Sequence, residues 1–144
     1  MDFVTSSLMV GDMQDAQAPP PFVSSVLFLA AEHRIAPPTG VMFESVPFME
    51  FQEADPEMLR RAIEWVERYE STGCVMVCCR AGMGRSVSVV IAYLCCVKGM
   101  QYTEAVKLLK SRRPGATPLP NLNQTIERVG SLRQVRPGLD QSFS

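Results

Sequence analysis

The chain has 144 residues, of which 47% are hydrophobic and 20% charged, and 14 lysines and arginines nearly balance 15 aspartates and glutamates. This length and composition suit a single globular domain and argue against disorder. The balanced charge gives no general attraction for nucleic acid, so any phosphate recognition has to be local. The first residues lack the pattern of a signal peptide, and no apolar run reaches the roughly 18 residues of a membrane span.

The five cysteines indicate a reducing compartment. They are an odd number, they include two adjacent pairs, and they show no CxxC spacing, so neither a disulfide framework nor a structural metal is expected. The single histidine, His33, is remote from them in sequence. We therefore expect the protein in the cytoplasm, with the nucleus as the alternative. The cysteines are Cys74, Cys78, Cys79, Cys95 and Cys96.

The first half of the chain predicts strands separated by loops and then a helix. Asp55 is a typical N-cap and Pro56 a typical first-turn residue, so this helix should begin here and run to about Glu70. Before it, strands are expected at residues 8–10, 25–30 and 41–48, with loops at residues 17–21 and 37–40.

The second half predicts one strand and then helices. Residues 74–79 are a continuous apolar run of strand length, and residues 86–97 are apolar nearly all round, as in a central buried helix. Thr103 is expected to cap a further helix that reaches about Lys110. The last helix should include Leu122, Ile126 and Val129.

The alternation of strands and helices predicts an α/β fold, a single domain with a central, mostly parallel sheet flanked by helices. We place this domain at residues 1–135 and expect residues 136–144 to form a flexible C-terminal tail. Arg112 and Arg113 could add positive charge near a pocket, but we interpret them as residues that favour a helix C-terminus.

Residues 79–86, Cys-Arg-Ala-Gly-Met-Gly-Arg-Ser, lie between the predicted strand and the buried helix. The N–H groups of such a turn and of the helix N-terminus converge on one spot, which favours an anion. Gly82 and Gly84 are expected to supply positive φ angles. Arg85 can bind two phosphoryl oxygens at once with its planar fork. The stretch therefore predicts a phosphate-binding loop.

Cys79 is the predicted nucleophile of this loop. A free cysteine is only about 3% thiolate at pH 7, and the electropositive loop would raise that fraction. Cys78 precedes it by one position on a strand, so its side chain must point to the other face of the sheet. A structural cysteine beside a turn is the alternative interpretation of Cys79.

The stretch resembles the signature of the cysteine-based protein phosphatases, which is Cys, five residues, Arg, and then Ser or Thr. More narrowly, the chain is similar to the small atypical dual-specificity phosphatases, a likeness that extends to residues 8–12, 46–50, 91–94 and 113–116. The resemblance implies that Cys79 forms a cysteinyl-phosphate and that Ser86 stabilises the thiolate. The phosphate-binding residues that it implies are Arg80, Ala81, Gly82, Met83, Gly84 and Arg85.

Two positions depart from the family pattern. Cys78 stands where the family usually has a histidine that fixes the loop and makes the thiol more acidic. The general acid is normally an aspartate about thirty residues before the nucleophile, and counting places Glu50 there. Asp55 is the nearest aspartate and the alternative acid, although it also suits a helix N-cap. Loss of acid catalysis would lower the rate by about 10² to 10⁴-fold. The identity of the general acid is therefore expected to affect the rate more than the missing histidine does.

The sequence therefore predicts a cysteine-dependent phosphatase for phosphotyrosine in proteins, with phosphoserine and phosphothreonine as further substrates. A phenol leaving group needs less protonation than an alkyl alcohol, which predicts a preference for phosphotyrosine. We expect a monomer that needs no metal or organic cofactor and that acts on phosphorylated protein, without nucleic acid or membrane insertion. The alternatives are a weakly active or inactive phosphate-binding pseudophosphatase and a phosphatase of a non-protein phosphomonoester.

Overall fold

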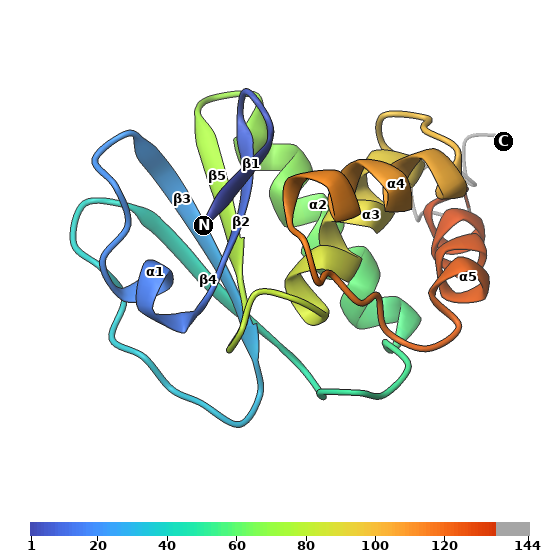
Figure 1. The fold of residues 1–144 in the computed structure, drawn as a ribbon, viewed down its shortest axis with the longest axis horizontal. Helices are drawn as coiled ribbons and strands as arrows, with labels where there is room; N and C mark the ends of the chain where they lie inside the picture. Colours follow the sequence, from blue (N-terminus) through green and yellow to red (C-terminus); the bar gives the residue numbers. More distant parts are fainter. Residues whose placement is uncertain (135–144) are drawn as a thin grey trace, which may run out of the picture.

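A five-stranded sheet forms one half of the computed structural model, which describes residues 1–134 (Figure 1). Its strand order is β1-β2-β5-β3-β4. β1 pairs antiparallel with β2, whereas the other neighbours pair in parallel. The predicted mostly parallel sheet is therefore confirmed. The strands are β1 (Asp2–Thr5), β2 (Leu8–Gly11), β3 (Val23–Ala30), β4 (Met42–Phe48) and β5 (Cys74–Cys78).

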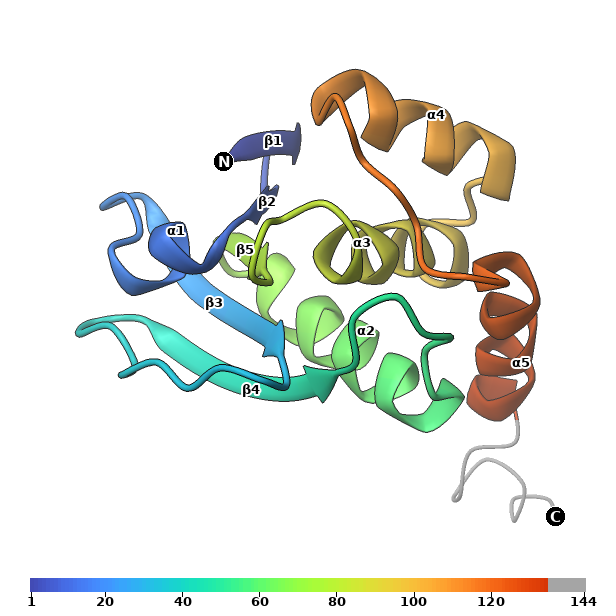
Figure 2. The same ribbon diagram turned by 60° about the horizontal axis from the view of Figure 1, so that its bottom comes forward.

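The helices cover the two faces of the sheet unequally. The short α1 lies on one face, and the longer helices gather on the other (Figures 1 and 2). Within residues 1–134, no helix is both long and apolar enough to cross a membrane. The helices are α1 (Met13–Gln17), α2 (Pro56–Glu70), α3 (Arg85–Cys96), α4 (Tyr102–Arg112) and α5 (Leu122–Gln134).

Two apolar clusters, one on each face, hold these layers together. On β3, Leu27 and Leu29 join the larger cluster with α2 and α3, while Val26 and Phe28 join the smaller cluster with Ala16 of α1. A strand buried on both faces needs apolar residues at every position, which explains the uninterrupted apolar runs. Helix α3 is buried from its first residue to Leu94, as the sequence predicts. It places the loop that precedes it against the centre of the fold.

Several local expectations need correction. Thr103 is not a helix cap, because α4 begins one residue earlier and has Gln101 as its N-cap. Strand β1 and helix α1 were not expected. Helix α1 starts with a reciprocal capping box, in which the side chains of Asp12 and Asp15 each accept from the other's backbone N–H at 2.9 Å. The predicted tail at residues 136–144 lies outside the described residues.

Candidate active site

The two adjacent cysteines lie on opposite faces of the sheet. β5 ends at Cys78, whose side chain is fully buried in the smaller cluster beside α1. Cys79 is 2% exposed and belongs to the larger cluster. Burial raises the pKa of the Cys78 thiol well above its ordinary value. Cys78 therefore stays a neutral thiol and is a poor nucleophile, whereas Cys79 begins the loop to α3.

Cys79 is held close to Ser86, as the resemblance implies. Its Sγ lies 3.3 Å from Ser86 Oγ, and Ser86 is fully buried. The backbone N–H of Cys79 donates to the carbonyl of Gly11 on the neighbouring strand at 3.3 Å. The hydroxyl of Ser86 can therefore donate to Cys79 whenever the sulfur carries a negative charge.

A pocket of about 420 Å³ contains Cys79 in its wall. The loop between β5 and α3 forms one side of it, and the segment that joins α4 to α5 lies beside this loop (Figure 2). Of the predicted phosphate-binding residues, only Gly82 is not part of the lining. The lining residues are Glu50, Phe51, Cys79, Arg80, Ala81, Met83, Gly84, Arg85, Thr117, Pro118, Leu119 and Pro120.

The two glycines of the loop differ in what they contribute. Gly82 has a φ of +72°, and a Cβ added there would lie 2.6 Å from Arg113 Nη2 and 2.7 Å from the carbonyl oxygen of Gly11. Gly84 has a φ of −119°, so the positive φ expected there is wrong. Its added Cβ would meet its nearest neighbour, the carbonyl oxygen of Thr117, at 3.4 Å. Only Gly82 is required by backbone conformation and space.

We expect Gly82→Ala to lower kcat/KM for an aryl phosphate by about 10- to 100-fold, because the loop must shift to accommodate the methyl group. Gly84→Ala is the matched control and should stay within about fivefold of wild type. Steady-state hydrolysis of p-nitrophenyl phosphate checks both variants. Equal losses in the two would contradict this account of the loop.

Arg85 is buried and is held by an acidic residue that the sequence analysis missed. Its Nη1 and Nη2 donate to the two carboxylate oxygens of Glu32 at 2.6 and 2.8 Å. Nη1 also donates to the carbonyl of Phe48, at the end of β4, at 3.0 Å. Only 2% of Arg85 is exposed, against 40% of the Glu32 side chain. The guanidinium is therefore fixed by the last residue of β4 and by the segment that follows β3, besides its own helix.

The ion pair between Glu32 and Arg85 persists at neutral pH. The hydrogen bonds from Arg85 hold the pKa of the Glu32 carboxyl well below its ordinary value, at about 2. Because that pKa is lowered by folding, the pair stabilises the fold above the ordinary carboxyl pKa, and this stabilisation is lost only as the pH falls towards 2. A buried arginine needs such a partner, but the sequence does not show which acidic residue supplies it.

The two candidate general acids lie in different parts of the structure. Glu50 lines the pocket, with its Oε2 4.0 Å from Arg85 Nη2 and its side chain 34% exposed. Asp55 is not part of the lining and accepts a hydrogen bond from the backbone N–H of Glu57 at 3.3 Å, as the N-cap of α2. The structure therefore brings Glu50, and not Asp55, to the pocket that holds Cys79.

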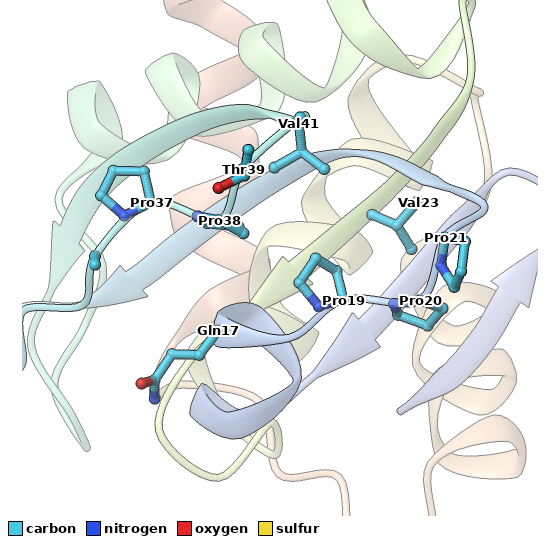
Figure 3. A pocket seen from close by; sticks show the side chains of 11 residues that line it. Gln17, Pro19, Pro20, Pro21, Val23, Pro37, Pro38, Thr39 and Val41 are labelled. Carbon is cyan, nitrogen blue, oxygen red and sulfur yellow. The ribbon is translucent and has the colours of Figure 1, made fainter.

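A larger hollow, of about 520 Å³, lies between two proline-containing loops (Figure 3). Pro19, Pro20 and Pro21 surround one part of it, and Pro37 and Pro38 another. Within residues 1–134, the side chains that line this hollow include no ionisable group. This hollow therefore lacks the acid, base or nucleophile that a catalytic site needs. The candidate active site is the pocket at Cys79.

A cysteine at the end of a central strand, facing a turn that leads to a buried arginine at the start of a helix, defines the class of cysteine-based phosphatases. The comparison with known families narrows this class. Residues 27–130 match the model of the family described as dual specificity phosphatase, catalytic domain. The chain therefore belongs to this family.

Curated relatives agree with this assignment. Dual specificity protein phosphatase 1 of Arabidopsis thaliana is 30% identical over 124 residues, which cover 85% of this chain and 61% of that protein. Dual specificity protein phosphatase 15 of Rattus norvegicus is 37% identical over 73 residues, which cover 49% of this chain and 31% of that protein. The matched part of each relative is thus less than two thirds of its length.

The fold also has solved counterparts. The crystal structure of human DUSP28 superposes with a TM-score of 0.80 at 24% identity, covering 93% of this chain and 98% of that one. At this level of sequence identity, the similarity shows that the two proteins share a fold. It confirms the phosphatase-type α/β fold, with the loop between a strand and a buried helix.

Proposed function

We propose that this domain hydrolyses phosphotyrosine in proteins through a cysteinyl-phosphate intermediate, with phosphoserine and phosphothreonine as poorer substrates. The observation that carries the proposal is the arrangement of Cys79, Ser86 and Arg85. The sulfur and the Ser86 hydroxyl are 3.3 Å apart, and Cys79 and Arg85 line one pocket. Membership of the dual specificity phosphatase family supports a phosphorylated protein as the substrate.

In the first step, the Cys79 thiolate attacks phosphorus, so that an S–P bond forms and the P–O bond to the leaving group breaks. The amides of residues 80–85 hold the phosphoryl oxygens, together with the N–H groups of Arg85 that do not bond to Glu32 or Phe48. These oxygens carry the developing charge. The leaving oxygen takes a proton from Glu50, the acid that lines the pocket. This step leaves phosphocysteine and the free hydroxyl product.

In the second step, water attacks the phosphocysteine and the S–P bond breaks. Glu50, now a carboxylate, accepts the proton of this water, and phosphate leaves. The hydroxyl of Ser86 donates to the sulfur as it regains its negative charge, consistent with their 3.3 Å separation. Residues that line the pocket, together with Ser86, which contacts Cys79, account for each proton and bond. No metal or organic cofactor is part of the proposal.

The lining of the pocket supports an aromatic leaving group. Phe51 follows Glu50, has a φ of +62°, and is 81% exposed. Pro118, Leu119 and Pro120 also belong to the lining. Apolar and aromatic groups at this position can contact a phenyl ring, and they offer an alkyl side chain such as that of phosphothreonine less contact area. This apolar lining therefore favours phosphotyrosine, as does the smaller need of a phenol leaving group for protonation.

We expect kcat/KM for a phosphotyrosine peptide to exceed that for the matched phosphothreonine peptide by about tenfold or more. Phosphate release from two peptides of identical flanking sequence measures this ratio. Phe51→Ala is expected to reduce the ratio, because it removes aryl contact and leaves Glu50 in place. Equal values of kcat/KM on the two peptides in wild type would contradict the preference.

Two substitutions keep a second function open. Cys78 in place of the usual histidine and Glu50 in place of the usual aspartate are the changes that a phosphate-binding pseudophosphatase could carry. Wild type that binds phosphopeptides but releases no phosphate from them or from an aryl phosphate would establish that function. Hydrolysis of a non-protein phosphomonoester alone would indicate the remaining alternative. A monomer in the cytoplasm, with the nucleus as the alternative, remains our prediction.

A further inference from the structure

We propose that Arg113 is a positioning residue that sets the direction of the amides in the phosphate-binding loop, and that Asp2 holds Arg113 in place. The proposal rests on the proposed function only in requiring that this loop binds a phosphoryl group. The sequence analysis interpreted Arg113 as a charge that favours a helix C-terminus. It is indeed the C-cap residue of α4, but its side chain extends to the loop.

The loop presents its amides to the pocket only if its carbonyls point the other way. In a planar trans peptide, the C=O of one residue and the N–H of the next are antiparallel. The carbonyl of Arg80 accepts from the backbone N–H of Met13 at 3.2 Å, and that of Met83 accepts from the backbone N–H of Thr117 at 2.8 Å. Backbone groups thus fix the first and last of four consecutive carbonyls.

Arg113 fixes the two carbonyls between them. Its Nε donates to the carbonyl of Gly82 at 3.1 Å, and its Nη2 donates to the carbonyl of Ala81 at 3.2 Å. With these bonds, each carbonyl from residue 80 to residue 83 has a donor outside the loop. The amides of residues 81–84 are thereby turned towards the opposite side, where the phosphoryl oxygens would bind.

The remaining nitrogen of Arg113 contacts the first strand of the sheet. Nη1 donates to Asp2 Oδ2 at 2.8 Å, and the side chains are 11% and 40% exposed, respectively. All three guanidinium nitrogens are therefore engaged, and Arg113 is not part of the pocket lining. Asp2 balances its charge. Arg113 thus acts through the loop rather than on the substrate directly.

The geometry requires a guanidinium rather than a positive charge alone. Nε and Nη2 of one planar group reach two successive carbonyls, whereas a lysine ammonium is a single point of contact on a flexible stem. A lysine at this position would leave one of the carbonyls of Ala81 and Gly82 without its donor. The peptide it belongs to could then rotate, and an amide would be lost from the phosphate site.

The test compares Arg113→Lys and Arg113→Gln with Arg112→Gln. Arg112 is the adjacent, exposed arginine, so its variant removes the same charge without touching the loop. Competitive inhibition of p-nitrophenyl phosphate hydrolysis by tungstate, a tetrahedral oxyanion, should weaken about tenfold or more in both Arg113 variants, and less than about twofold in Arg112→Gln. Alkylation of Cys79 by iodoacetamide at a fixed pH should be slower in the Arg113 variants than in Arg112→Gln.

A second variant keeps the proposal falsifiable if the Arg113 variants unfold. Asp2→Asn retains both bonds from Arg113 to the loop but weakens its anchor, so tungstate inhibition should weaken about two- to fivefold, with folding checked by thermal unfolding. Unchanged tungstate inhibition and alkylation in a folded Arg113→Lys or in Asp2→Asn would overturn the proposal. Wild type that binds tungstate in calorimetry but hydrolyses no phosphoester would instead contradict the proposed function alone, and the tungstate affinities of the variants are then compared by calorimetry.

Discussion

Cys79→Ser is expected to abolish phosphate release, lowering kcat/KM by at least about 10³-fold. A serine hydroxyl is hardly ionised at neutral pH, and within residues 1–134 the side chain that hydrogen-bonds to position 79 is the Ser86 hydroxyl, at 3.3 Å, which is not a general base. The substitution keeps the volume of the side chain nearly unchanged. Hydrolysis of p-nitrophenyl phosphate measures the loss, and tungstate binding by calorimetry shows whether the pocket survives.

The neighbouring cysteine provides the matched control. Cys78→Ser makes the same chemical change one residue earlier, but on the face of the sheet that packs against α1. Its kcat/KM should remain within about fivefold of wild type. A serine hydroxyl buried there without a partner should lower the free energy of unfolding by about 1 to 3 kcal/mol. Loss of hydrolysis in Cys78→Ser, with hydrolysis retained in Cys79→Ser, would contradict the assignment of Cys79 as the nucleophile.

The elements that the sequence predicts well are those with a local physical signal. Asp55 and Pro56 mark the start of α2 because a cap and a fixed φ act within a single turn. The apolar run before Cys79 and the apolar helix after Arg85 are evident because both are buried on all sides. Only residues 79–84 separate the buried strand from the buried helix, so the position of the proposed phosphate site could be inferred as well.

The features that the sequence does not predict depend on distant partners. Glu32 lies 53 residues before Arg85, and Arg113 lies 31 residues after Gly82. Nothing local distinguishes Glu32 from the other acidic residues or Arg113 from Arg112. Only the folded chain, in which the ends of β3 and β4 and the C-cap of α4 meet the loop, selects them. The short β1 and α1 were missed because they carry little periodicity.

Glu50→Gln is expected to lower kcat/KM for a phosphothreonine peptide by about 10² to 10⁴-fold, and for p-nitrophenyl phosphate by a smaller factor. Glutamine keeps the shape of the side chain but has no proton to give to the leaving oxygen. The loss should therefore grow as the leaving group becomes less acidic, from p-nitrophenol through tyrosine to threonine. Steady-state kinetics on these three kinds of substrate measures that dependence.

Asp55→Asn tests the other candidate acid without disturbing the fold. Asparagine is as good an N-cap as aspartate, so α2 should keep its start and kcat/KM should stay within about fivefold of wild type. A steep loss in Asp55→Asn, with Glu50→Gln near wild type, would mean that Asp55 moves from its cap to the pocket during turnover. If both variants lose equally on every substrate, neither is the acid, because a missing proton donor affects poor leaving groups most.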